Sequence, residues 1–118
     1  MTPTPKMLEE LYCLVCKLPP INKWKMPNTA EIVFKVADEV YFNNELCYAT
    51  YTFDDGLHEI LISREMNKTF NDILCSLLHE MIHMRRAGKT EDWDKHDAVF
   101  KKYAKKICEE FGLNRIGF

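Results

Sequence analysis

The sequence predicts an α+β fold in which a three-stranded antiparallel sheet is flanked by three helices. β-branched and aromatic residues separated by turn signals dominate residues 31–63, as in strands. Helical periodicity dominates residues 70–111, and glycines at positions 88 and 112 supply stop signals. A chain of 118 residues that is 47% hydrophobic can bury one core, and no Pro/Gly/Ser-rich linker divides it. We therefore expect a single domain spanning residues 1–118, with the helix at 70–87 in its middle.

The first half of the chain predicts one helix and then the sheet. Thr4 is placed to cap a helix that has Pro5 at its first position, and Pro19-Pro20 ends it. A polar loop at 21–30 leads to a strand at 31–36. Two further strands are expected at 46–53 and 57–63. The turn residues Asp54-Asp55-Gly56 join them as a hairpin.

The helix at 70–87 has clear boundaries and an unusual division of its faces. Thr69 is placed to cap its start, Asp72 suits the positive end of the helix dipole, and Gly88 stops it. Most of the circumference is apolar, which is typical of a central helix. These apolar residues are Ile73, Leu74, Leu77, Leu78, Met81 and Ile82. The remaining polar stripe consists of Asp72, Ser76, His79, His83 and Arg86.

Two histidines on that stripe form a metal-binding pattern with a carboxylate between them. His79 and His83 are four residues apart, so both project from the same side of the helix and can reach one ion. Glu80 lies about 100° round the helix from His79. That position suits a general base acting on a water molecule beside the metal. We interpret the pattern as functional rather than as two incidental histidines.

A catalytic zinc normally takes three protein ligands, and His96 is the favoured third. It opens the helix expected at 93–111, which Gly112 ends. Val99, Phe100, Tyr103 and Ile107 follow it at helical spacing, so His96 should face the core. The alternatives are a carboxylate from Glu109 or Glu110, the thiol of Cys47, or a structural His96 bonded to a loop carbonyl. Tyr103 is expected to be a core aromatic rather than a donor to the reaction.

Two stretches of the sequence resemble a known family. Residues 77–83 (Leu-Leu-His-Glu-Met-Ile-His) and 95–100 (Lys-His-Asp-Ala-Val-Phe) are similar to the SprT-like metalloproteases, which include the Spartan proteases of DNA–protein crosslink repair. The strand at 57–63 resembles the one that precedes the active-site helix there. The resemblance implies a small zincin-like fold, a zinc ion held by His79, His83 and His96, and Glu80 as the catalytic residue.

The chain also departs from this family. Lys95 and Asp97 stand where glycines often flank the third histidine. Residues 1–118 do not include the zinc ribbon or DNA-binding tail into which many members of the family continue. The resemblance therefore implies a peptidase more directly than a role in crosslink repair. We expect one zinc per chain and hydrolysis of flexible or unfolded protein segments, which would pair with an exposed edge of the strand at 57–63. The alternative is a non-catalytic zincin-fold module with a structural zinc that binds DNA or a protein. The intact Glu80 favours the enzyme.

Composition limits the remaining functions. A net charge of -2 argues against a dedicated nucleic-acid binder. Residues 85–118 nevertheless contain nine Lys or Arg and six Asp or Glu, so a weak association with nucleic acid remains an alternative. No run is apolar and long enough for a membrane span, and no signal sequence begins the chain, which favours the cytoplasm or nucleoid. The odd count of five cysteines predicts free thiols, with Cys13 and Cys16 as core residues rather than metal ligands. The sequence does not indicate the oligomeric state.

Overall fold

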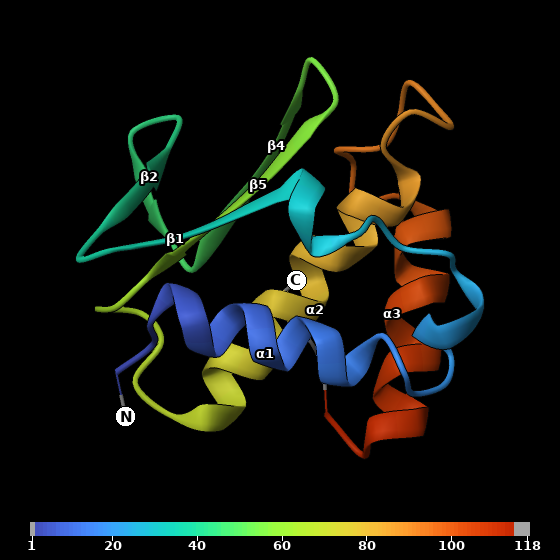
Figure 1. Ribbon diagram of the computed structural model, residues 1–118, viewed down its shortest axis with the longest axis horizontal. Coiled ribbons are helices and arrows are strands. Elements are labelled where there is room, and N and C mark those ends of the chain that lie inside the picture. The colour runs from blue at the N-terminus through green and yellow to red at the C-terminus, as the bar shows by residue number, and fades with distance from the viewer. Residues whose placement is uncertain (1, 115–118) are drawn as a thin grey trace.

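The computed structural model of the protein describes residues 2–114 as an α+β fold with three α-helices and two small sheets (Figure 1). The helices are α1 (Pro5–Val15), α2 (Phe70–Arg86) and α3 (Ala98–Phe111). Two short 3-10 turns, Ile21–Lys23 and Thr29–Glu31, lie between α1 and the first strand. The strands are β1 (Ile32–Ala37), β2 (Val40–Phe42), β3 (Glu45–Cys47), β4 (Ala49–Asp54) and β5 (Leu57–Ser63).

The larger sheet is mixed, so the prediction of an all-antiparallel sheet is wrong. Its order is β1-β5-β4, with β1 parallel to β5 and β4 antiparallel to β5. Parallel neighbours need a crossover connection, and here the chain from β1 to β5 supplies it by forming β2, β3 and then β4. β2 and β3 pair as a separate antiparallel sheet that we did not predict. The strand expected at 46–53 is interrupted at Tyr48.

Two tight turns close the hairpins. Asp55 and Gly56 have φ values of 50° and 79°, which confirms the predicted turn between β4 and β5. Asn43 and Asn44 have φ values of 52° and 65° and join β2 to β3. Two consecutive residues with positive φ give the turn whose twist matches that of paired strands. Asparagine tolerates this conformation better than most residues, which explains how a hairpin forms there without glycine.

One face of the larger sheet packs against the helices. Tyr12 of α1 contacts Phe34 of β1 with ring centroids 5.6 Å apart, and Phe34 lies beside Ile60 of β5 in the ladder. α2 packs against β4 and β5 and also contacts α1 and α3 (Figure 1). This central position confirms the prediction, made from the largely apolar circumference of this helix, that it lies in the middle of the domain. The fully buried side chains of α2 are those of Ile73, Leu77, Leu78, Met81 and Ile82.

The helix ends follow local capping chemistry. The Thr69 side chain accepts a hydrogen bond from the Asp72 amide and the Asp72 carboxylate accepts one from the Thr69 amide, which confirms the predicted start of α2. α3 begins at Ala98 rather than at residue 93, because Asp97 is its N-cap and accepts a hydrogen bond from the Phe100 amide. His96 therefore lies in the loop before α3 and not on a helix face. Gly112, with φ of 68°, ends α3 as predicted.

Some expectations about the surface are also tested. No disulfide links the five cysteines, which all lie within the described residues, and Cys13 is exposed rather than part of the core. No helix among the described residues is long and apolar enough to cross a membrane.

We expect Gly56→Ala to destabilise the protein by about 1–2 kcal/mol, because a Cβ disfavours the left-handed backbone of this turn. A Cβ at this position would have no atom within 4 Å, so steric clash with neighbours adds nothing. The free energy of unfolding in urea measures the effect. Gly56→Asn is the matched control and should cost less, and an equal cost for both variants would contradict the backbone explanation.

Candidate metal centre

The structure brings the three predicted histidines together at one point. α2 presents His79 and His83 one turn apart, and the loop before α3 presents His96. The Nε2 atom of His96 lies 3.1 Å from Nε2 of His79 and 3.1 Å from Nε2 of His83. One ring nitrogen from each histidine lies within 4.8 Å of the others, so the three residues form a group that can hold a metal ion. His83 is buried and His96 is exposed, which leaves one side of the centre open to solvent.

The protein fixes which nitrogen of His83 faces the other two rings. Its Nδ1 lies 2.9 Å from the carbonyl oxygen of Trp93, and only a protonated Nδ1 can donate to that oxygen. In the neutral ring, Nε2 then carries the lone pair and points at His96. Burial lowers the pKa of His83 and of His96, so both rings favour the neutral form. A carbonyl that orients the ring in this way is typical of a metal-binding histidine.

The residues present fit a divalent ion that prefers nitrogen ligands. Three neutral rings with converging Nε2 atoms cannot all satisfy their lone pairs with one another, because a neutral imidazole has one N–H to donate. A cation at their meeting point would accept all three. Tetrahedral zinc with bonds of about 2.0–2.1 Å to nitrogen would place these atoms roughly 3.3 Å apart. The observed separations of 3.1 Å are close to that value.

A phenylalanine forms the floor of the centre. Phe100, which is fully buried, packs against all three imidazoles. Its ring centroid lies 4.9 Å from that of His79, 4.9 Å from that of His83 and 4.6 Å from that of His96. Because Phe100 belongs to the first turn of α3, the packing of that helix against α2 also restricts the three rings. The sequence quoted for the family resemblance contains this residue four positions after His96.

An ion pair between the two helices holds His96 in place. The Arg86 guanidinium donates to both carboxylate oxygens of Asp97, at 2.9 and 3.0 Å. It also donates to the carbonyl oxygen of Lys95 at 3.0 Å. His96 is therefore held between two residues that are both bound to Arg86. The guanidinium also holds the pKa of Asp97 below its usual range.

Glu80 lies beside the centre with its carboxylate inside the protein. Its Oε2 is 4.0 Å from Nε2 of His79, and the residue is 6% exposed. Burial raises the pKa of Glu80 to about 8. Burial also raises the pKa of the Cys47 thiol, and the Glu80 carboxylate adds to that rise. Cys47 is not among the residues that converge with the histidines.

β4, and not β5, provides the sheet edge near the centre. β5 is paired on both sides, so the prediction of an exposed substrate edge at 57–63 is wrong. Tyr51 of β4 packs edge-on against Trp93, with centroids 5.6 Å apart, in the loop whose carbonyl orients His83. Within residues 2–114, no strand pairs with the outer edge of β4.

The residues that orient the three histidines were not predicted from the sequence. Trp93 acts through its backbone carbonyl, which no side-chain pattern reveals. Arg86 was assigned only to the polar stripe and Asp97 only to a departure from the family pattern. A signal existed, because a basic residue three positions after His83 and an acidic residue next to His96 can pair once their helices pack. Tyr103 packs edge-on against Trp24 with centroids 5.1 Å apart, as the core-aromatic interpretation expects.

Comparison with known proteins finds no matching family model, no similar curated protein and no similar solved structure. The geometry of the site therefore carries the functional argument.

We expect Asp97→Ala to lower the free energy of unfolding by about 2 kcal/mol or more, because it removes a helix cap and leaves a buried guanidinium unpaired. Asp97→Asn keeps an acceptor for the cap but loses the charge, so its cost should be smaller. Urea titrations of both variants test this. The exposed Asp94→Ala provides the control, and a comparable loss there would contradict the assignment.

Glu80 should make the stability of the metal-free protein depend on pH. Its pKa is raised from 4.5 to about 8 in the folded chain. The contribution of the protonated carboxyl to the free energy of unfolding is therefore fully present below pH 4.5 and is lost as the pH rises through about 8. We expect Glu80→Gln to become more stable relative to wild type as the pH rises, with a slope approaching about 1.4 kcal/mol per pH unit. Urea titrations in the presence of a chelator at several pH values measure it. A constant difference between the two proteins would rule out a buried titrating carboxyl.

Proposed function

We propose that this protein is a zinc-dependent peptidase. The observation that carries the proposal is the arrangement of three converging imidazoles with a buried carboxylate 4.0 Å from one of the ligand atoms. A single substrate group could then contact both a metal held by the histidines and a carboxylate that transfers protons.

Zinc is the ion that suits these ligands best. Neutral imidazoles are good ligands for zinc, whereas calcium and magnesium require oxygen donors. Iron, copper and nickel also accept imidazole, but a tetrahedral site with three histidines and one open position is typical of catalytic zinc. A structural zinc site normally has four protein ligands, and among the described residues only three converge here. We therefore favour a catalytic ion, one per chain, over a structural one.

The chain's own residues would then divide the work of hydrolysis. His79, His83 and His96 would hold the ion, which when bound supplies Lewis acidity toward a water molecule and a carbonyl oxygen. Glu80 would accept the proton of the attacking water and deliver it to the leaving amine. Burial raises the pKa of the Glu80 carboxyl in the metal-free chain, whereas a cation beside it would favour the carboxylate form, which can accept a proton.

The substrate would lie extended along the outer edge of β4. That edge borders the loop that contributes His96, through the contact between Tyr51 and Trp93. An extended chain could add to the edge through backbone hydrogen bonds, which requires a flexible or unfolded substrate. The sequence motifs and this arrangement both support placing the chain with the SprT-like metalloproteases and their zincin-like fold, and we propose that relation.

The first experiment measures zinc per chain by elemental analysis of untagged protein. We expect about one zinc in wild type and a clear loss in His96→Ala, since removal of one of three ligands should greatly weaken binding. His58→Ala is the control, because His58 is a strand histidine bonded to Tyr51 outside the centre. Equal zinc in wild type and His96→Ala would overturn the three-histidine site.

The second experiment asks whether the centre is catalytic. We expect Glu80→Gln to retain zinc while cleavage of an unfolded protein, such as reduced carboxymethylated lactalbumin, falls by about 10²-fold or more. Mass spectrometry of the products follows the cleavage. Cleavage at the wild-type rate by Glu80→Gln would show that Glu80 is not the base.

A further inference from the structure

The hairpin formed by β2 and β3 exposes large aromatic side chains. Tyr41 is 57% exposed, Phe42 is 63% exposed, and Tyr48, which links the hairpin to β4, is 50% exposed. Leu46 in the same hairpin is 41% exposed. A small protein rarely leaves several large apolar side chains together on its surface without a partner for them. Tyr41 and Leu46 lie opposite each other in the ladder, and Phe42 projects from the other face of the hairpin. We call these four residues the aromatic hairpin surface.

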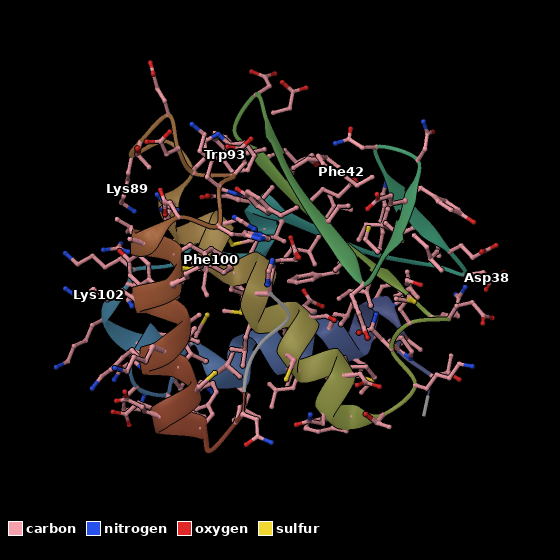
Figure 2. The ribbon with its side chains drawn as sticks, turned by 180° about the vertical axis from the view of Figure 1, so that it is seen from behind. Asp38, Phe42, Lys89, Trp93, Phe100 and Lys102 are labelled. Atoms are coloured by element: carbon pink, nitrogen blue, oxygen red, sulfur yellow. The ribbon has the colours of Figure 1, made fainter. Side chains whose placement is uncertain are left out.

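This surface adjoins the candidate centre. The hairpin contacts β4 and β5 through β2, and the chain passes directly from Cys47 through Tyr48 into β4. α2, which carries the proposed base Glu80, packs against β4. Figure 2 shows β4 running between Trp93 on one side and the hairpin that carries Phe42 on the other. A chain extended along β4 would therefore meet both.

The same part of the chain is strongly acidic. Residues 31–65 contain eight Asp or Glu against two Lys or Arg, a net charge of -6. Both basic residues are already in ion pairs, Lys35 with Glu59 and Arg64 with Asp38, each at 3.0 Å. Five exposed carboxylates of this segment, including those of Glu31 and Glu39, have no ion-pair partner within the described residues. Three of the five lie in β3, in β4 or in the turn that follows β4. They are Glu45 at the start of β3, Asp54 at the end of β4 and Asp55 in the following turn.

We propose that the edge of β4 and the aromatic hairpin surface select substrate segments in which Lys or Arg residues alternate with large apolar ones. The proposal rests on the proposed function and names the substrate class for that site. Successive side chains of an extended segment point to opposite sides, so one row can contact aromatic rings while the other approaches carboxylates. The carboxylates of the surface would repel a segment rich in Asp or Glu, and this repulsion would discriminate against such segments.

The test measures the binding of peptides to zinc-loaded Glu80→Gln protein, in which cleavage is suppressed. The probe is a fluorescein-labelled decapeptide that alternates Lys with Phe or Val, and its twin carries Glu in place of every Lys. We expect fluorescence anisotropy to show about tenfold or tighter binding of the lysine peptide at low salt, with the gap narrowing as salt screens the charges. Equal binding of the twins, or tighter binding of the acidic one, would overturn the proposal.

Surface variants identify where the peptide binds. The triple variant Glu45→Gln, Asp54→Asn, Asp55→Asn removes three charges with little change of shape, and Asn at position 55 tolerates its φ of 50°. We expect it to weaken binding of the lysine peptide about threefold to tenfold. The control removes three charges elsewhere, at Glu10, Glu109 and Glu110. Equal effects of the two triple variants would mean that only net charge matters and would overturn the assigned surface.

The aromatic part of the proposal is tested separately. Phe42→Ala should weaken binding several-fold, because it removes exposed apolar area from the docking path. Phe70→Ala is the matched control, since Phe70 is 47% exposed at the start of α2, away from the hairpin. An unchanged affinity for Phe42→Ala would overturn the role of the hairpin.

Failure of this inference and failure of the proposed function give different results. If wild-type protein cleaves unfolded substrates but the twin peptides bind equally, the peptidase stands and the substrate class is wrong. If the lysine peptide binds selectively but zinc-loaded wild-type protein cleaves nothing, the surface stands and the peptidase is wrong.

Discussion

The bidentate ion pair between Arg86 and Asp97 is the interaction on which the candidate metal centre depends. Arg86 ends α2 and is 5% exposed, so its charge would be costly without a partner. Asp97 supplies that partner and caps α3, while the Lys95 carbonyl accepts a further bond from the same guanidinium. One contact therefore fixes where α3 starts, how it packs on α2 and where His96 lies. Without it, the loop that carries His96 would keep only the contacts of Trp93 with His83 and Tyr51 and the packing of His96 on Phe100.

The central helix combines two demands that oppose each other. Its apolar residues hold the core together, and yet Glu80, His79 and His83 are buried among them. A buried carboxyl with a pKa of about 8 and imidazoles with lowered pKa values show that these groups are poorly solvated in the folded chain. Binding of a cation to the folded state alone would stabilise the fold by mass action. The centre thus lowers the intrinsic stability of the protein in the place where a bound metal would restore it.

Local signals in the sequence were sufficient for the helix that carries the motif. Thr69 and Asp72 cap its start through bonds that span three residues, and the positions of His79 and His83 follow from helical periodicity alone. The Asp55-Gly56 turn was equally local. The parallel pairing of β1 with β5 was not predictable in this way, because it joins segments more than twenty residues apart and depends on the hairpin between them.

The start of α3 shows how a local signal can be misread. Apolar spacing around His96 suggested a helix from residue 93, but Asp97 competes for the position of N-cap and its partner Arg86 is distant in sequence. His96 reaches the centre all the same, since a loop between two packed helices can present a side chain as well as a helix face can. The three histidines that converge were thus predictable from residue types, whereas the means of holding His96 required the tertiary contact.

The small net charge of the chain conceals two regions of opposite sign. Residues 31–65 carry a net charge of -6, whereas α3 exposes Lys101, Lys102, Lys105 and Lys106. Figure 2 shows Lys89 and Lys102 on one side of the molecule and Asp38 on the other. The field of the sheet would attract a basic segment toward the edge of β4, and the lysines of α3 would repel it. A nucleic-acid backbone would experience the reverse, so any phosphate would approach α3 and leave the edge of β4 clear.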